Sequence, residues 1–274
     1  MGEAVHSNHD DISQTDECPG LIDTHCHLDL EPLSEHLPRV LSEAHLAGVS
    51  LFVVPGVHPA GWSRMDALGR DYSDVFPAFG IHPMHAGLAD DDTLARLASI
   101  AAGGVAIGEI GLDPAYTVSM DHQERAFRDQ VRLAVDVGLP ILVHCRRAFQ
   151  QTLRIMQEER ASHVGGIMHA FSGSPEMARE FIRLGFAISV SGMVTRENSL
   201  RLHKVVHDLP LEELVLETDA PDMTPQLYRG RPNQPAYMLE TLNTVARIKG
   251  VEPAVAARSC SIRSRAALNR LPVS

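Results

Sequence analysis

Short apolar runs alternate with longer segments in which apolar residues recur at helical spacing, from Leu21 to near the end of the chain. Such runs are typical of buried strands, and the segments between them of amphipathic helices. Eight runs can be recognised, at residues 21–23, 49–54, 75–80, 104–109, 140–145, 164–170, 186–191 and 214–219. Since eight strand–helix units close a parallel barrel, the pattern predicts an α/β fold of the TIM (β/α)8 type.

The segments between the predicted strands carry independent helix signals. After the sixth strand, Ser174 is a favourable N-cap, Pro175 suits the first helical position and Gly185 ends the apolar stripe. A doubly wound open sheet would give a similar alternation, but no GxGxxG turn follows the first strand. No boundary interrupts the alternation, so we predict one barrel domain over residues 21–274.

The segment from Met1 to Gly20 lacks this pattern. It is rich in Asp, Ser, Asn, His and Glu and has no apolar period. Such a segment buries too little apolar surface to offset the entropy of ordering, so we expect a flexible N-terminal tail. No apolar run approaches the roughly 20 residues of a membrane span, and no signal-peptide pattern is present. We therefore expect a cytoplasmic protein without a membrane partner.

The amino-acid composition limits which partners the protein can bind. The chain has 274 residues, of which 44% are hydrophobic and 22% charged, as in an ordinary globular protein, and its formal net charge is −11. This charge argues against a nucleic-acid footprint over the whole surface, because such footprints neutralise phosphates. A nucleic-acid substrate would need a locally basic mouth or bound metals. The four cysteines form no CxxC pair, and we expect them reduced in a monomer or small homo-oligomer.

Residues suited to metal binding fall at the C-terminal ends of the predicted strands. They are four histidines and two carboxylates, namely His25, His27, His144, His169, Glu109 and Asp219. In a parallel barrel these ends meet at one mouth, where barrel active sites lie. The six side chains are therefore expected to converge there.

Alternation of side chains along a strand refines this placement. His25 and His27 should share a face, with Cys26 turned to the other side. By the same rule Ile107 and Glu109 should face together.

Four imidazoles and two carboxylates at one point need a partner, because an unpaired buried polar group costs several kcal/mol. A divalent cation is the natural partner, and Zn, Mn, Mg and Co all suit such donors, so the metal identity stays open. Six ligands exceed one tetrahedral ion, so we predict one or two ions, about 3.5–4 Å apart if two, with Glu109 bridging. A bound cation lowers the pKa of water from about 15.7 toward 7. Asp219 is placed to orient that water and take its proton, which predicts hydrolysis.

Seven motifs carry a family resemblance. They read IDTHCHLD, GIHP, GEIGLD, LPILVHCR, HAFSG, LETDAP and RPNQPAY, from about Leu21 to the C-terminus. In this order and spacing they resemble the TatD family of metal-dependent deoxyribonucleases, within the amidohydrolase superfamily. The resemblance implies a TIM barrel and phosphodiester hydrolysis, often as a 3′-to-5′ exonuclease. It places His25, His27 and Asp219 on one metal and His144 and His169 on the other, and it makes Glu109 the shared ligand.

Two positions depart from the family pattern. Pro114 and Ala115 stand where an aromatic pair is usual, and Arg147 stands where many members carry Asp. Both changes resemble a less characterised TatD-like branch.

Four further residues are candidates for substrate binding. His82 ends the third strand and can contact substrate or cap a turn. Arg146 can bind a phosphate or make a structural ion pair. Arg229 and Arg231 follow the last metal residue and can line the mouth or lie on plain surface. The turn at residues 172–174 opens a helix whose free N–H groups suit a phosphate oxygen, although helix capping explains it equally.

These observations favour a phosphodiesterase acting on DNA or RNA ends. The alternative is a metal-dependent hydrolase of a small ester, amide or phosphorylated metabolite, since the fold and the metal site serve all of these. A non-catalytic metal-binding or interaction protein is disfavoured by the intact carboxylates at Glu109 and Asp219.

Overall fold

Eight parallel strands form the centre of the molecule in the computed structural model, which describes residues 20–272. Apart from Gly20, the expected N-terminal tail lies outside these residues. The strands are β1 (Leu21–Asp23), β2 (Val49–Pro55), β3 (Val75–Phe79), β4 (Ala106–Leu112), β5 (Ile141–Cys145), β6 (Gly166–Met168), β7 (Phe186–Val190) and β8 (Leu214–Leu216). They pair in sequence order from β1 to β8, which confirms the predicted barrel.

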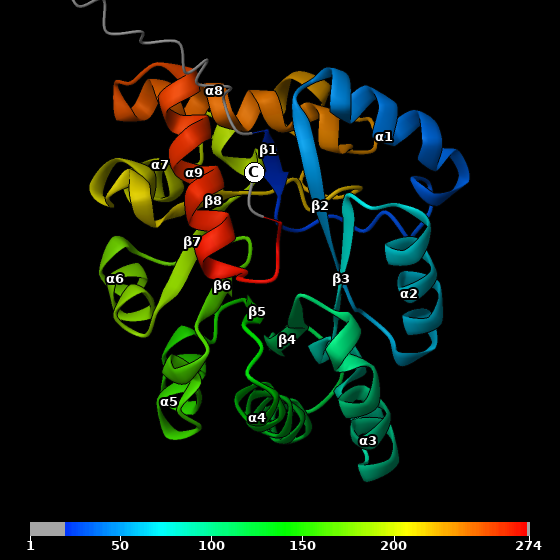
Figure 1. Cartoon of the computed structure of the whole chain (residues 1–274). Coiled ribbons are helices and arrows are strands. Elements are labelled where there is room, and N and C mark those ends of the chain that lie inside the picture. Colours follow the sequence, from blue (N-terminus) through cyan, green and yellow to red (C-terminus); the bar gives the residue numbers. More distant parts are fainter. Residues whose placement is uncertain (1–19, 273–274) are drawn as a thin grey trace, which may run out of the picture.

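Among residues 20–272, α-helices surround the strands, and the last of them lies across one end of the barrel (Figure 1). Within the described residues the α-helices are α1 (Leu37–Leu46), α2 (Trp62–Asp71), α3 (Asp91–Ile100), α4 (Met120–Val137), α5 (Phe149–Glu158), α6 (Pro175–Arg183), α7 (Leu200–Asp208), α8 (Met238–Lys249) and α9 (Pro253–Ala267). None of them is long and apolar enough to cross a membrane.

The helix signals of the sequence act as predicted at α6. The hydroxyl of Ser174 accepts a hydrogen bond from the backbone N–H of Met177 at 3.3 Å, and Pro175 is the first residue of the helix. Gly185 follows the helix with φ of 88°, a left-handed conformation that favours glycine. Ser174 and Gly185 therefore set the two ends of the helix.

The interior of the barrel is filled by one small apolar layer. Each strand contributes to it, for example Val53 of β2, while the neighbouring Phe52 and Val54 pack between the sheet and the helices. Leu268 and Leu271, just after α9, join the same interior layer. This C-terminal segment, which the strand–helix pattern does not predict, therefore closes the N-terminal end of the barrel.

The barrel closes between β1 and β8 through backbone hydrogen bonds that lie just beyond the strands. The N–H of Asp219 donates to the carbonyl of His25 at 2.8 Å, and the N–H of His27 donates to the carbonyl of Ala220 at 2.8 Å. Both hydrogen bonds involve predicted site residues. The hydrogen bonds that close the sheet therefore also place these residues.

The expected alternation fails on β4. Ile107 packs between the sheet and the helices, whereas Glu109 lines the cavity at the mouth, so the two do not face together. The pairing of β4 with β5 shifts register between Ile107 and Ile110. An extra residue in one strand resets the alternation, which explains how Glu109 reaches the mouth.

Three cysteines in the described residues are free and buried, namely Cys26, Cys145 and Cys260. Cys18 lies outside the described range.

Candidate metal centre

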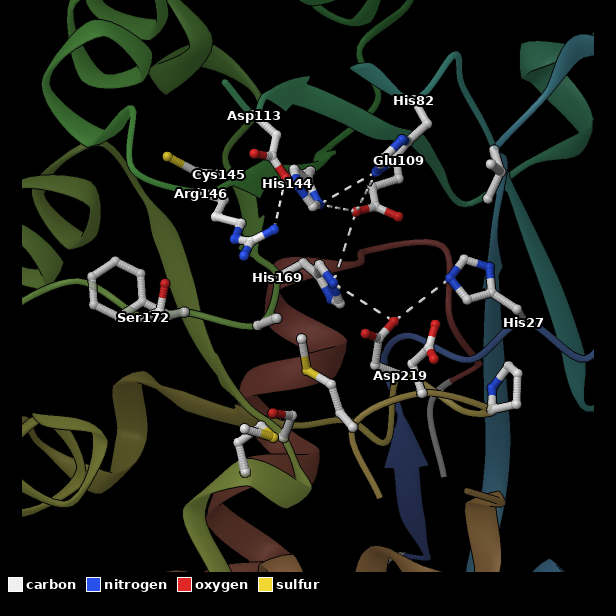
Figure 2. A pocket seen from close by; sticks show the side chains of 18 of the residues that line it. His27, His82, Glu109, Asp113, His144, Cys145, Arg146, His169, Ser172 and Asp219 are labelled. Atoms are coloured by element: carbon white, nitrogen blue, oxygen red, sulfur yellow. Dashed lines mark hydrogen bonds and ion pairs between the residues drawn. The ribbon is translucent and has the colours of Figure 1, made fainter. Parts of the chain in front are cut away.

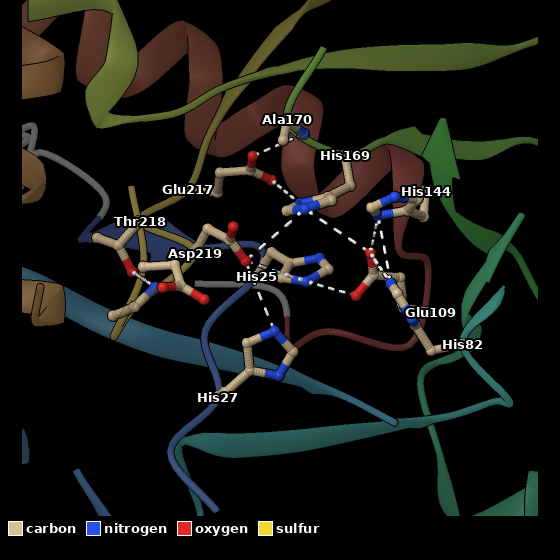
Figure 3. Close-up of polar contacts among 12 residues, drawn as sticks. His25, His27, His82, Glu109, His144, His169, Ala170, Glu217, Thr218 and Asp219 are labelled. Carbon is tan, nitrogen blue, oxygen red and sulfur yellow. Dashed lines mark hydrogen bonds and ion pairs between the residues drawn. The ribbon is translucent and has the colours of Figure 1, made fainter. Parts of the chain in front are cut away.

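Glu109 lies at the centre of the histidines that the sequence singled out (Figure 3). Its Oε2 atom is 3.2 Å from Nε2 of His25, and its Oε1 atom is 2.7 Å from Nδ1 of His144. The same Oε1 atom is 3.8 Å from Nε2 of His169. The two carboxylate oxygens therefore face different imidazoles, as the oxygens of a bridging ligand do.

Asp219 faces a partly overlapping set of rings. Its Oδ1 atom is 3.5 Å from Nε2 of His27, 3.6 Å from Nε2 of His25 and 3.7 Å from Nε2 of His169. His25 and His169 stack on one another with ring centroids 3.5 Å apart, between the two carboxylates. All six predicted residues therefore meet at one place.

The donor set fits a divalent cation. Nδ1 of His25 and Nδ1 of His27 are buried without a hydrogen-bond partner among the described residues, and Nε2 of His25 lies near Glu109 without the geometry of a hydrogen bond. Buried nitrogens without partners are costly unless a ligand satisfies them. In the part of the chain that the structure describes, three groups have donor atoms close enough to hold an ion: His25 with His169 and Asp219, His25 with His27 and Glu109, and His82 with Glu109 and His144. Nitrogen and oxygen donors at these positions suit several divalent metals.

The two carboxylates stay ionised despite their burial. Burial alone would raise the pKa of Glu109, but the imidazoles of His82, His25 and His169 hold it well below its usual range. Burial likewise opposes the charge of Asp219, yet the neighbouring histidines, His169 foremost, lower its pKa. The centre therefore presents two negative charges to a cation at neutral pH.

The imidazoles of the centre differ in pKa. Burial lowers the pKa of His25, and the neighbouring His169 lowers it further. Burial opposes the charge of His144 as well, but hydrogen bonds with Asp113 and Glu109 raise its pKa to about 9. For His169 the cost of burial is outweighed by nearby carboxylates, Glu217 first, which raise the pKa to about 10. Carboxylates therefore dominate the surroundings of these two rings.

Two buried carboxylates that the sequence analysis missed contact the ring nitrogens of His169 and His144 that face away from the centre. Glu217 lies 3.0 Å from Nδ1 of His169 and accepts a hydrogen bond from the N–H of Ala170 at 2.7 Å. Asp113 lies 3.2 Å from Nε2 of His144. Partners of this kind fix the orientation of a metal-binding imidazole. The signal was present in LETD and GEIGLD, where each carboxylate stands close to a predicted ligand.

A third buried carboxylate, Asp23, joins β1 to the end of β8. Its Oδ2 atom accepts a hydrogen bond from the hydroxyl of Thr218 at 2.5 Å, and its Oδ1 atom accepts one from the N–H of Thr218 at 2.9 Å. Burial raises the pKa of Asp23 to about 7. Its oxygens are thus engaged in closing the barrel next to His25.

His82 takes the capping role considered for it, and its ring also reaches the metal centre. Its Nδ1 atom accepts a hydrogen bond from the N–H of Met84 at 3.2 Å, which caps a short turn. Its Nε2 atom lies 3.5 Å from Oε1 of Glu109 and 3.4 Å from Nδ1 of His144. Contact with substrate stays a prediction, but the ring reaches the centre.

A cavity of about 1010 Å³ opens over the centre (Figure 2). Arg146 lines it with an exposed side chain, and its Nη1 atom is 3.9 Å from Oδ2 of Asp113, a loose ion pair. Arg229 and Arg231 are exposed and do not belong to the described residues that line this cavity. Substrate binding by these three arginines stays a prediction.

An aromatic ring reaches the cavity next to the position where the family's usual aromatic pair is replaced. Tyr116 follows Pro114 and Ala115, and its ring centroid is 5.4 Å from that of His82 and 6.2 Å from that of His144. Burial raises the pKa of Tyr116, so its hydroxyl keeps its proton at neutral pH. An aromatic residue therefore still lines the cavity, although Pro114 and Ala115 stand where an aromatic pair is usual.

Comparisons with known proteins identify the family. The family model described as TatD related DNase matches residues 22–268. The uncharacterized metal-dependent hydrolase YabD of Bacillus subtilis is 38% identical over 232 residues, covering 84% of this chain and 91% of the relative. The 3′-5′ ssDNA/RNA exonuclease TatD of Cronobacter sakazakii is 34% identical over 224 residues, covering 79% of this chain and 85% of the relative.

Solved structures give the same result. YjjV, a TatD homolog from Escherichia coli, matches with a TM-score of 0.86 at 30% identity, covering 93% of this chain and all of that chain. A TatD family hydrolase from Entamoeba histolytica matches in fold with a TM-score of 0.80 at 19% identity, covering 91% of this chain and 98% of the other. The chain therefore belongs to the TatD-related DNase family and is a metal-dependent hydrolase built on a TIM barrel.

Proposed function

We propose that this protein hydrolyses phosphodiester bonds at the ends of DNA or RNA strands, in the 3′-to-5′ direction, with one or two divalent cations. The observation that carries the proposal is Glu109, whose two oxygens face His25 on one side and His144 on the other. A bridging carboxylate between two sets of imidazoles is the arrangement of two-metal phosphoesterases. The exonuclease relative from Cronobacter sakazakii supports the choice of substrate.

The cations are assigned to two sets of ligands. His25, His27 and Asp219 form one set, His144 and His169 form the other, and Glu109 is shared. The distances from Asp219 Oδ1 to Nε2 of His27 and of His25, 3.5 Å and 3.6 Å, support the first set. Zn, Mn, Mg and Co remain the candidate metals, since imidazole and carboxylate donors accept each of them.

Cations held by the six ligands would supply a Lewis acid for a phosphoryl oxygen and would lower the pKa of the attacking water. Asp219 orients this water and takes its proton as the oxygen–phosphorus bond forms and the bond to the leaving oxygen breaks. Glu217 and Asp113 keep the rings of His169 and His144 in place through their outer nitrogens. His82 and Arg146 line the cavity and contact the phosphate.

A small phosphoester or other small ester is the second candidate substrate. Two observations favour it, namely the net charge of −11 and a cavity of about 1010 Å³, which is close to the upper end of sites for small molecules, roughly 300–1,000 Å³. The experiment below separates the two candidates.

The test is hydrolysis by the purified protein with Mn, Mg, Co or Zn, against end-labelled single-stranded DNA and RNA and a panel of p-nitrophenyl phosphoesters. We expect strands to shorten from the 3′ end. Metal analysis should find about one to two ions per chain, and His25→Ala with His27→Ala should lose at least one of them. His36→Ala, which changes an exposed histidine outside the cavity, serves as the matched control.

Hydrolysis of the panel without shortening of either strand would assign the second candidate. Full metal content in the His25→Ala, His27→Ala variant would contradict the ligand assignment.

A further inference from the structure

A second hollow, of about 460 Å³, adjoins the cavity over the centre. Its volume lies within the roughly 300–1,000 Å³ range of ligand sites. The side chain of Arg201 lines both spaces, so the hollow opens beside the cavity rather than elsewhere on the surface. The other residues that line it are Arg147, Ala148, Phe149, Gln150, Gln151, Gly173, Ser174 and Met177.

Consecutive residues of two loops lead from the cavity into the hollow. After β5, Arg146 lines the cavity and Arg147 lines the hollow. After β6, Ser172 lines the cavity and Gly173 lines the hollow. Figure 2 shows Arg146 and Ser172 on the side of the cavity opposite His27. A chain-like ligand with one end at the centre therefore has an open path along this side.

The hollow is positively charged in an acidic protein. Arg147 and Arg201 are both exposed, and within residues 20–272 neither makes an ion pair. No aspartate or glutamate is among the described residues that line the hollow, although the chain has 35 acidic residues against 24 Lys and Arg. Arginines kept free of carboxylates beside a site suit an anion such as a phosphate.

The remaining lining residues fit a nucleotide. Helix α5 starts at Phe149 without a side-chain cap, and residues of its first turn line the hollow, so N–H groups without helical partners lie in the segment that borders it. Phe149, which is half-buried and whose ring centroid is 5.4 Å from that of Phe171, lines the same space. Aromatic rings beside a basic groove are surfaces on which the bases of single strands stack.

We propose that this hollow binds the part of a single-stranded nucleic acid that continues 5′ of the cleaved bond, with Arg147 and Arg201 on successive phosphates. The proposal rests on the proposed function, because it takes the 3′ end of the strand to lie in the cavity. It makes a strand of several nucleotides, and not a small phosphoester, the substrate for which the site is built.

The test is binding of 5′-fluorescein dT12 with phosphorothioate linkages, which resist hydrolysis, to the full-length protein as purified, followed by fluorescence anisotropy over a range of salt concentrations. We expect Arg147→Ala with Arg201→Ala to raise Kd by about tenfold or more at low salt. The slope of log K against log salt should become shallower by roughly 1.4, since each phosphate contact on a single strand contributes roughly 0.7.

Two controls make the test specific. Arg160→Ala changes an arginine that is also exposed and also has positive φ, 57° against 54° for Arg147, but lies before β6 at the opposite end of the barrel. It should leave Kd within about twofold of the wild type. Arg147→Lys with Arg201→Lys keeps the charges and should keep the salt slope.

An unchanged Kd and slope in the Arg147→Ala, Arg201→Ala variant would overturn the proposal, as would failure of the wild type to bind dT12. The proposed function is judged separately, by hydrolysis. Strand binding that depends on both arginines without hydrolysis would contradict the function alone, and hydrolysis of strands with arginine-independent binding would contradict this proposal alone.

Discussion

The carboxylates of Glu109 and Asp219 have similar burial but different partners. Glu109 divides its two oxygens between His25 and His144, whereas Asp219 turns one oxygen toward three imidazoles, the nearest being His27 at 3.5 Å. A carboxylate that shares both oxygens between imidazoles has none left to accept a proton. Asp219 is therefore the better candidate for the base.

We predict that Asp219→Asn lowers kcat by at least 10²–10⁴-fold, the usual contribution of general-base catalysis. The change keeps the size of the side chain and one oxygen but removes the charge. The loss should persist at saturating metal, because restoring the ion does not restore a base. Steady-state kinetics across a metal titration, with metal content measured alongside, check this. Recovery of wild-type kcat on adding metal would show that Asp219 only holds the ion, and His82 would be the next candidate.

The six proposed ligands could be predicted because each stands at the end of an apolar run, and parallel strands bring such ends together. The roles of Glu217 and Asp113 could not, since they depend on which ring nitrogen of His169 and His144 faces outward. Ring orientation is set by tertiary contacts that no local pattern records.

Helices α4 and α5 are joined by a network of charged side chains on the outside of the barrel. Arg128 donates to Glu159 at 2.6 Å and to Glu158 at 2.6 Å, and Arg132 donates to Glu159 through Nε at 2.7 Å. The side chain of Glu159 is only 11% exposed, so its hydrogen bonds are partly shielded from water. The network therefore stabilises the seam between these two helices.

We predict that Glu159→Gln lowers the free energy of unfolding by about 1–2 kcal/mol near pH 7. The hydrogen bonds from Arg132, and then those from Arg128, hold the pKa of Glu159 below its usual value. The stability it contributes is therefore present above its unfolded-state pKa of about 4.3 and is lost as the pH falls through the lower folded-state pKa. Urea unfolding at several pH values measures the difference between wild type and variant.

Glu158→Gln serves as the control, because the side chain of Glu158 is 49% exposed and should contribute less. A difference for Glu159→Gln that stays constant down to pH 3 would contradict the assigned role of its charge.

At the level of elements, the sequence predicts all eight strands but neither the register shift on β4 nor helix α9. The shift between Ile107 and Ile110 depends on pairing with β5, which is distant in sequence. Helix α9 follows α8 without a strand between them, so the strand–helix pattern gives no sign of it.

The whole molecule has a net charge of −11, although the proposed function requires anionic strands to approach its mouth. Composition alone indicates that a nucleic-acid substrate requires a local exception to this charge. Composition cannot tell where on the surface the basic site lies, because Arg147 and Arg201 come together only in the folded barrel. A bound cation at the centre offsets part of the remaining negative charge, which links metal binding to the stability of the fold.

We predict that Mn or Zn raises the thermal midpoint and that a chelator lowers it. A ligand at 100 times its Kd adds about 2.7 kcal/mol to the folded state. For a domain of this size that amounts to roughly 5–10 °C. Differential scanning fluorimetry with metal and with EDTA checks this, and His27→Ala should show a smaller shift than the wild type. A midpoint that does not respond to metal in the wild type would contradict the fit of the centre to a cation.

The C-terminal segment after α9 fills the barrel at the end opposite the metal centre, through Leu268 and Leu271. The residues that hold the fold together at this end therefore lie apart from the loops at the mouth that face substrate. Substitutions in those loops can change what the enzyme accepts at little cost to folding. Divergence of substrate preference within one stable scaffold follows from this separation, and directed evolution of the protein is best confined to the loops that follow β5, β6 and β7.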